Sequence, residues 1–150
     1  MTPPEPTASP SGRPPRTPRL TGPGGKRATV IGAGSFGTAL AVLLARGGLR
    51  TTLMARTPEQ AAALQSEREN RTYLPGVPLP QELRIETLAA GLSRADLVFL
   101  AVPSNVLGEV AGGLEAAGIG RRAAVVSAAK GLVPPDGLPP TFVLNARFDG

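Results

Sequence analysis

The chain contains no cysteine, no histidine and no tryptophan, and it has a single tyrosine. Without cysteine it cannot form disulfides or use thiolate chemistry. Without histidine it lacks the commonest general acid–base group and the commonest protein ligand of metal ions. We therefore expect no metal site, and any proton transfer has to use lysine, tyrosine, a carboxylate or a group outside this chain.

Long hydrophobic runs are also missing. No apolar segment reaches the roughly 20 residues that a membrane-spanning helix needs, and no apolar signal-peptide core follows the charges at the N-terminus. We therefore expect a soluble, cytoplasmic protein without membrane insertion. The chain has 150 residues, of which 41% are hydrophobic, and this is enough for one domain with its own core.

The N-terminal segment has few acidic residues, and most of the net positive charge of the chain lies there. The formal net charge is +5, but residues 1–27 hold five basic side chains against one acidic side chain, and residues 28–150 are nearly neutral. The positive charge is therefore no sign of a folded nucleic-acid surface, and we expect no nucleic-acid partner.

The N-terminal segment also has almost no large apolar side chains. Residues 1–25 contain eight of the 17 prolines. Such a segment cannot bury enough surface to offset the entropy of ordering, so we predict a disordered Pro/Arg-rich tail over residues 1–26. A basic arm for acidic partners or a proline-rich ligand segment are alternatives, and a mis-assigned start codon would also produce such a tail.

From residue 27 onward, short β-branched runs alternate with helical patterns, which predicts βαβ units. The fold class is α/β, with a Rossmann-type, doubly wound and mainly parallel sheet over residues 27–138. Residues 139–150 are expected to be irregular. The expected strands are 28–32, 50–55, 83–86, 96–102 and 122–129. The expected helices are 36–46, 57–70 and 103–117, with a helical turn or two over 87–92 and a proline-rich loop over 71–80.

The most specific motif is a glycine-rich turn between the first expected strand and helix. Gly32 permits a tight exit from the strand, Gly34 lets backbone approach a pyrophosphate, and Gly37 lets helix and strand pack closely. The pyrophosphate would lie on the free N–H groups near Ser35 and Phe36. Because a strand precedes the glycines and a helix follows them, the motif predicts binding of NAD(H) or NADP(H) rather than a purely structural turn.

Other candidate residues follow the remaining strands, because ligands of open α/β sheets lie over the carboxyl ends of the strands. These candidates are Arg56, Thr57, Val102, Pro103 and Lys130.

The position that usually carries an acidic residue for the ribose 2′-OH is occupied by Arg56, and the first acidic residue is Glu59. A cation suits a 2′-phosphate, so NADPH should bind at least as well as NADH. The alternative is that Arg56 is a solvated loop arginine.

Lysine and tyrosine are rare in this chain, and one residue of each type is a candidate site residue. Lys130 is the only lysine after Lys26, in a chain that otherwise uses arginine for positive charge. An ammonium can titrate and donate from a compact head, so Lys130 is a candidate for substrate and cofactor contact, with an exposed strand-end lysine as the alternative. Tyr73, the only tyrosine, lies in the proline-rich segment and, taken alone, is more often a loop anchor than a site residue.

Four segments together resemble the N-terminal domain of the bacterial NAD(P)-dependent sn-glycerol-3-phosphate dehydrogenases. They are 32–41 (GAGSFGTALA), 67–76 (ERENRTYLPG), 101–104 (AVPS) and 130–132 (KGL). The resemblance covers about residues 27–138 and implies that Ser35, Phe36, Arg56, Tyr73 and Lys130 line the cofactor site. Phe36 stands where tryptophan is expected.

The resemblance also implies an activity, the reduction of dihydroxyacetone phosphate by NAD(P)H for phospholipid synthesis. Residues 139–150 do not continue the family pattern, and we expect the helical substrate domain with the main catalytic lysine to lie outside this chain, which alone would then be inactive. Another NAD(P)-dependent reductase, such as a ketopantoate reductase, is disfavoured by the segments at 67–76 and Lys130. A truncated, non-catalytic nucleotide-binding module is the other alternative.

Overall fold

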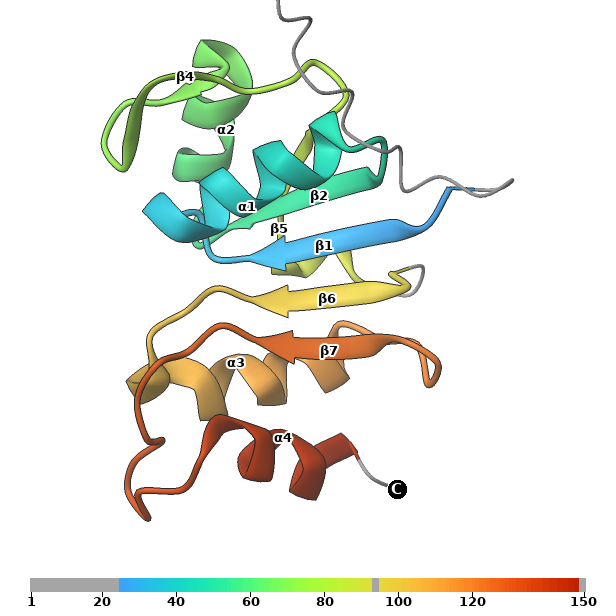
Figure 1. Cartoon of the computed structure of the whole chain (residues 1–150), viewed down its shortest axis with the longest axis vertical. Coiled ribbons are helices and arrows are strands. Elements are labelled where there is room, and N and C mark those ends of the chain that lie inside the picture. Colours follow the sequence, from blue (N-terminus) through green and yellow to red (C-terminus); the bar gives the residue numbers. More distant parts are fainter. Residues whose placement is uncertain (1–24, 93–94, 149–150) are drawn as a thin grey trace, which may run out of the picture.

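The computed structural model of the chain describes residues 25–92 and 95–148. Five strands form one sheet in the order β5-β2-β1-β6-β7 (Figure 1), and all neighbouring strands in it are parallel. The sheet strands are β1 Arg27–Ile31, β2 Arg50–Ala55, β5 Arg84–Thr87, β6 Leu97–Leu100 and β7 Ala124–Ser127. Their carboxyl ends therefore meet at one edge, on the left in Figure 1.

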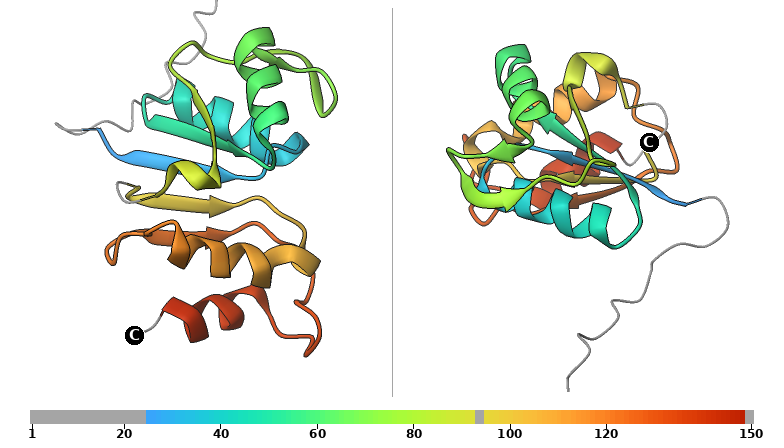
Figure 2. Two further views of the ribbon diagram at one scale, coloured as in Figure 1. Left: turned by 180° about the vertical axis from the view of Figure 1, so that it is seen from behind. Right: turned by 90° about the horizontal axis from the view of Figure 1, so that it is seen from above.

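Helices cover both faces of the sheet, so the predicted doubly wound α/β fold is confirmed. The helices are α1 Ser35–Arg46, α2 Pro58–Glu67, α3 Ser104–Ala116 and α4 Pro140–Phe148, with a short 3₁₀ turn, η1, at Leu88–Ala90. In one core, side chains of α1 and α2 pack on Val30 and Leu53. In the other, side chains of α3 and α4 pack on Val98 and Leu100. Figure 2, seen from behind, shows α3 in front of β7.

The proline-rich segment differs from its prediction. A small hairpin pairs β3 (Glu69–Asn70) with β4 (Leu74–Pro78), where we expected a loop. Helix α2 stops at Glu67 because Arg68 takes a left-handed conformation with φ of 51°. Prolines are tolerated in β4 because this two-stranded sheet has only edge strands, whose outward positions need no N–H donor.

The prediction of an irregular C-terminal end was wrong for secondary structure, because Pro140–Phe148 form helix α4. Proline suits the first position of a helix, where its missing N–H would have no helical partner. Leu144 is buried in the same core as α3, and Arg147 pairs with Glu115 at 3.4 Å. The boundaries proposed for the domain and the segments on either side of it stay predictions.

Most of the predicted disordered tail lies outside the described residues, which begin at Gly25. Within residues 25–92 and 95–148, no helix has the length and apolarity to cross a bilayer. The same ranges contain no group of three or more acidic side chains placed to hold a metal ion.

Candidate functional site

The glycine turn lies at the centre of the carboxyl edge of the sheet. Strand β1 ends at Ile31, and α1 begins at Ser35. The backbone N–H of Gly32 donates to the carbonyl oxygen of Met54 on β2 at 3.1 Å. The N–H of Ala101, after β6, donates to the carbonyl oxygen of Ile31 at 2.8 Å. Both neighbouring strands therefore fix the start of the turn.

The structure divides the three motif glycines into two kinds. Gly32 has φ of +109°, and a Cβ there would overlap the carbonyl oxygen of Ala101. A Cβ on Gly37 would overlap the carbonyl oxygen of Gly32 and lie 3.0 Å from its carbonyl carbon. A Cβ on Gly34 would meet nothing within 4 Å. Gly32 and Gly37 are thus required by packing, whereas the space beside Gly34 is open.

The first turn of α1 faces that open space. Gly34 is the N-cap and makes no side-chain hydrogen bond, and the first turn contains no acidic residue. Helix N-termini carry free N–H donors and a partial positive charge, which together favour anions. Ser35 is exposed, and the Phe36 side chain is 59% exposed. The turn therefore has the geometry of an anion cradle, and an exposed aromatic residue follows it in the first turn of α1.

Arg56 and Thr57 follow β2, on one side of the turn. The Thr57 hydroxyl accepts a hydrogen bond from the N–H of Gln60 at 3.2 Å and so caps α2, which is a structural role for this candidate. The backbone N–H of Arg56 donates to Oε1 of Gln60 at 2.9 Å. Within the described ranges the Arg56 guanidinium makes no salt bridge, and the residue is exposed.

Glu59, the first acidic residue after the glycines, lies in the first turn of α2. A hydrogen bond from its own backbone N–H, followed by one with the Thr57 hydroxyl, lowers the pKa of Glu59 below its usual value. This carboxylate is therefore ionised at neutral pH and is engaged with the helix N-terminus.

A buried asparagine joins the hairpin to the glycine turn, and the sequence analysis did not single it out. Asn70 is 4% exposed. Its Nδ2 donates to the carbonyl oxygen of Ala33 at 3.0 Å and to the hydroxyl of Thr38 at 2.8 Å, while its Oδ1 accepts from the N–H of Tyr73 at 3.3 Å. One amide thus holds the turn, helix α1 and the backbone of Tyr73 in a fixed relation. The Tyr73 side chain is 48% exposed.

Asn70→Ala is expected to destabilise the fold by about 1–3 kcal/mol, because it leaves the buried groups of Ala33 and Thr38 without their partner. Urea unfolding followed by circular dichroism measures this loss. Thr72→Ala, at an exposed position of the same hairpin, is the control and should change stability by less than about 0.5 kcal/mol. Equal midpoints for the two variants would contradict the role assigned to Asn70.

The remaining candidates follow β6 and β7. Val102 lies against the turn, since its Cγ1 would be 3.1 Å from a Cβ on Gly32, and the exposed Pro103 precedes α3. Lys130 is exposed after β7, the edge strand beyond β6. The structure therefore brings the glycines and Val102 into contact, with Arg56 and Lys130 on opposite sides of them along one edge.

Comparison with known proteins identifies the family. A model of the "NAD-dependent glycerol-3-phosphate dehydrogenase N-terminus" family matches residues 27–144. A glycerol-3-phosphate dehydrogenase [NAD(P)+] of Deinococcus radiodurans is 42% identical over 126 residues, which cover 83% of this chain and 37% of that protein. The crystal structure of glycerol-3-phosphate dehydrogenase from Coxiella burnetii has a TM-score of 0.77 at 28% identity, covering 84% of this chain and 38% of that one.

The alternative reductase family is a weaker match. A 2-dehydropantoate 2-reductase (ketopantoate reductase) from Methylococcus capsulatus has a TM-score of 0.57 at 16% identity, a likeness that shows the fold alone. The chain spans well under half the length of the relatives described above. Family model, sequence identity and fold agree, and the chain belongs to the family of the N-terminal, NAD-binding domains of NAD-dependent glycerol-3-phosphate dehydrogenases.

Proposed function

We propose that residues 27–144 bind NADPH or NADH at the carboxyl edge of the sheet, as the cofactor half of a glycerol-3-phosphate dehydrogenase. The observation that carries this proposal is the open space at Gly34, directly in front of the uncapped N-terminus of α1. A dinucleotide pyrophosphate suits this place because it needs close backbone approach and free N–H donors. The residues present therefore fit the cofactor.

The other candidates receive roles from their positions along the edge. Arg56, after β2, is assigned to the 2′-phosphate of NADPH. Phe36, Tyr73, Val102 and Pro103 are assigned to the walls of the cofactor site, and Thr57 orients the Arg56 loop through its cap of α2. Lys130 is assigned to substrate and cofactor contact. When bound, the reduced nicotinamide supplies a hydride to the carbonyl carbon of the substrate.

The substrate proposed for the whole protein is dihydroxyacetone phosphate, which the relatives' names indicate through its reduced form, glycerol 3-phosphate. This chain's own contribution is to hold the cofactor and to place one ammonium group near the substrate. Lys130 can donate a hydrogen bond to the substrate and stabilise negative charge that develops on its oxygen. We assign the exclusion of water from the site to the part of the relatives' sequence that this chain does not cover.

Cofactor choice tests the assignment of Arg56. Arg56→Ala should weaken NADPH binding by about 1.5–3 kcal/mol and leave NADH binding nearly unchanged, because only NADPH carries the 2′-phosphate. Isothermal calorimetry with both cofactors measures the difference. Arg121→Ala, at another exposed arginine, is the control and should affect neither cofactor. Equal losses of affinity for NADPH and NADH would show that Arg56 does not contact the 2′-phosphate. If the native chain does not bind NADPH, the proposed function is wrong.

Turnover tests the assignment of Lys130. We expect the chain to bind NADPH without reducing dihydroxyacetone phosphate, and activity to arise when the chain is joined to the rest of the Deinococcus radiodurans relative. In that joined protein, Lys130→Arg should lower kcat at least about tenfold, since arginine keeps the charge but lacks the compact ammonium head. NADPH oxidation at 340 nm measures both effects. Full activity of the Lys130→Arg protein would show that Lys130 is only an exposed residue at the end of a strand, without a role in turnover.

A further inference from the structure

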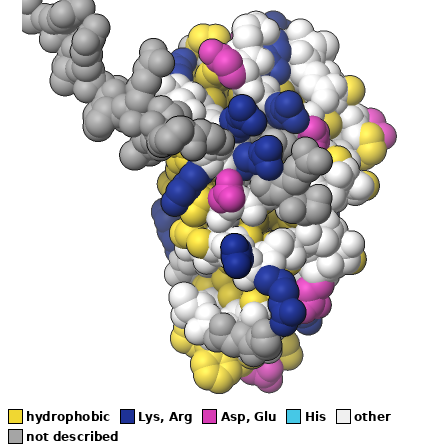
Figure 3. All heavy atoms as spheres, turned by 90° about the vertical axis from the view of Figure 1, so that its right-hand side faces the viewer, with side chains coloured by type: hydrophobic (Ala, Val, Ile, Leu, Met, Phe, Trp, Pro, Cys, Tyr) yellow, Lys and Arg dark blue, Asp and Glu magenta, His cyan; other side chains and the backbone are white. Residues whose placement is uncertain are grey.

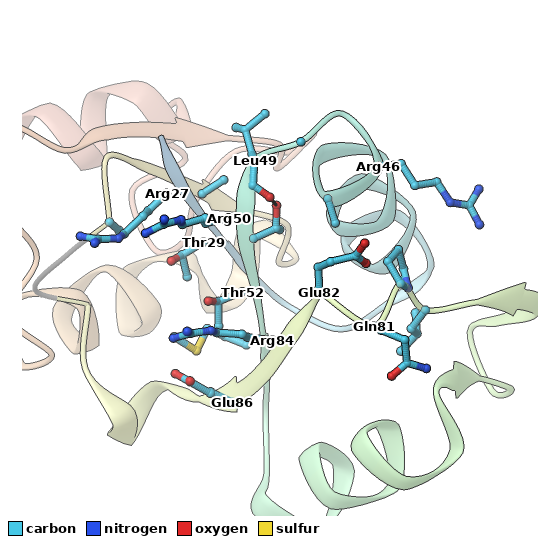
Figure 4. Close-up of a pocket in the computed structure, with 18 of the residues that line it drawn as sticks. Arg27, Thr29, Arg46, Leu49, Arg50, Thr52, Gln81, Glu82, Arg84 and Glu86 are labelled. Atoms are coloured by element: carbon cyan, nitrogen blue, oxygen red, sulfur yellow. Dashed lines mark hydrogen bonds between the residues drawn. The ribbon is translucent and has the colours of Figure 1, made fainter. Parts of the chain in front are cut away.

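A large cavity in the described part of the chain lies far from the glycine turn, at the amino-terminal ends of β1, β2 and β5 (Figure 4). Its volume is about 1180 Å³. Part of its wall is the face of these strands that points away from the core shared by α1 and α2. Figure 3 looks onto this edge of the molecule, where several Lys and Arg side chains gather. None of the residues assigned to the cofactor lines this cavity.

Strand register places three arginines on the same face of the sheet. Arg27 is paired with Arg50 across β1 and β2, and Thr52 is paired with Arg84 across β2 and β5. Residues two apart in a strand point to the same side, as do register partners on neighbouring strands. Thr29 is the partner of Thr52 and adds a second hydroxyl to this face. Figure 4 shows the three guanidinium groups on one side of β2 with both threonines beside them.

The guanidinium groups of this face form no salt bridge with described residues, although the backbone N–H of Arg27 donates to Oδ2 of Asp96 at 2.8 Å. Within residues 25–92 and 95–148, the salt bridges involve only Arg71 and Arg147 among the basic residues. Glu86 lies on the same stretch of the cavity wall without forming an ion pair. The cavity is lined by four arginines (Arg27, Arg46, Arg50 and Arg84) and two glutamates (Glu82 and Glu86), so its wall carries a net positive charge, and the neighbouring guanidinium groups on the sheet face repel one another. An anion in the cavity would relieve this repulsion.

We propose that this cavity is a second anion site, separate from the dinucleotide turn, for a soluble ligand that carries at least two linked phosphate groups. Neighbouring strands are about 4.8 Å apart and rise about 3.3 Å per residue, so the Cα atoms of Arg27 and Arg84 lie roughly 12 Å apart. Such a spread suits linked phosphates, each able to accept a guanidinium fork.

The threonines argue for a small ligand rather than a membrane surface. Thr29 is 6% exposed and lines the cavity on β1, two residues after Arg27 and beside Thr52 of β2. A planar lipid surface can meet the ends of exposed arginines but cannot reach a nearly buried hydroxyl. A compact polyphosphate can enter the cavity, accept hydrogen bonds from the guanidinium groups and approach the threonine hydroxyls.

Calorimetric titration of the full chain with inorganic triphosphate tests the proposal. We expect a binding event that Arg50→Gln/Arg84→Gln weakens at least about tenfold, because each charge-assisted contact contributes substantially to binding. Arg121→Gln/Arg122→Gln removes the same charge from exposed residues outside the cavity and should change the affinity less than about twofold. Orthophosphate should bind at least about tenfold more weakly than triphosphate.

A further variant separates this site from the glycine turn. In Gly34→Asp, which places a carboxylate in the turn, the binding event that Arg50→Gln/Arg84→Gln weakens should remain. The proposal is overturned if triphosphate does not bind, if both double variants lose affinity equally, or if the Gly34→Asp substitution abolishes triphosphate binding. These outcomes do not depend on whether the chain binds NADPH, so failure of the proposed function and failure of this inference are distinguishable. Thermal melting should show that both double variants remain folded.

Discussion

Gly34→Asp is expected to lower NADPH affinity at least about 100-fold in a chain that remains folded. Aspartate is a favourable N-cap residue, and its carboxylate would accept the free N–H groups of α1 that we assign to the pyrophosphate. A Cβ at this position meets no neighbour within 4 Å. The substitution should therefore stabilise the fold by about 0.2–0.5 kcal/mol while it blocks the ligand. A variant that gains stability and loses binding separates ligand contact from folding.

Calorimetry measures the affinity in this experiment, and the fluorescence of Tyr73 gives a second readout. Because the chain has one tyrosine and no tryptophan, its intrinsic emission reports on that residue alone. Gly34→Asn is the matched control, since asparagine also caps a helix but adds no negative charge, and its loss of affinity should be smaller. NADPH affinity equal to that of the native chain in a folded Gly34→Asp variant would show that the turn is only structural.

Gly37→Ala is expected to reduce the free energy of unfolding by about 3 kcal/mol or more. The added methyl group would overlap the carbonyl oxygen of Gly32 and lie 3.1 Å from the Cβ of Ala101. Backbone cannot move aside as a side chain can, so α1 would have to shift away from the sheet, and inserted methyl groups in tight packing commonly cost about 1–3 kcal/mol. Urea unfolding measures the loss.

Gly34→Ala is the control for this second prediction, because it adds the same methyl group three residues earlier, where the space is open. Its effect should stay below about 1 kcal/mol, the difference between glycine and alanine at an N-cap. If the two variants unfold at the same urea concentration, the packing role of Gly37 is wrong.

The sheet and the glycine turn could be predicted because their signals are local. Strand β2 has the predicted bounds, and the three glycines lie between a strand and a helix. Each of these features follows from a few neighbouring residues whose conformational preferences agree. The fold class then follows from the alternation of strands and helices.

The features that were missed depend on distant partners. Nothing near Asn70 in the sequence indicates that its amide reaches Ala33 and Thr38, which are brought to it by the packing of α1. The pairing of β3 with β4 was hidden by prolines, which usually interrupt strands. Helix α4 had a local signal, proline at its first position, but its stability comes from packing on α3. Such contacts are decided by tertiary structure.

The position of β1 in the sheet has a consequence for how the chain acquires its structure. β1 pairs with β2, which follows it closely, but its other neighbour is β6, so that Ala28 is paired with Leu97. Closing the longer loop costs more entropy, and contacts between distant residues form more slowly. During synthesis from the N-terminus, the β6 side of β1 therefore stays an open edge until β6 has left the ribosome. The central strand of the finished sheet, β1, therefore has an unpaired edge during synthesis. At this stage the nascent chain is most prone to aggregation through edge-to-edge strand pairing.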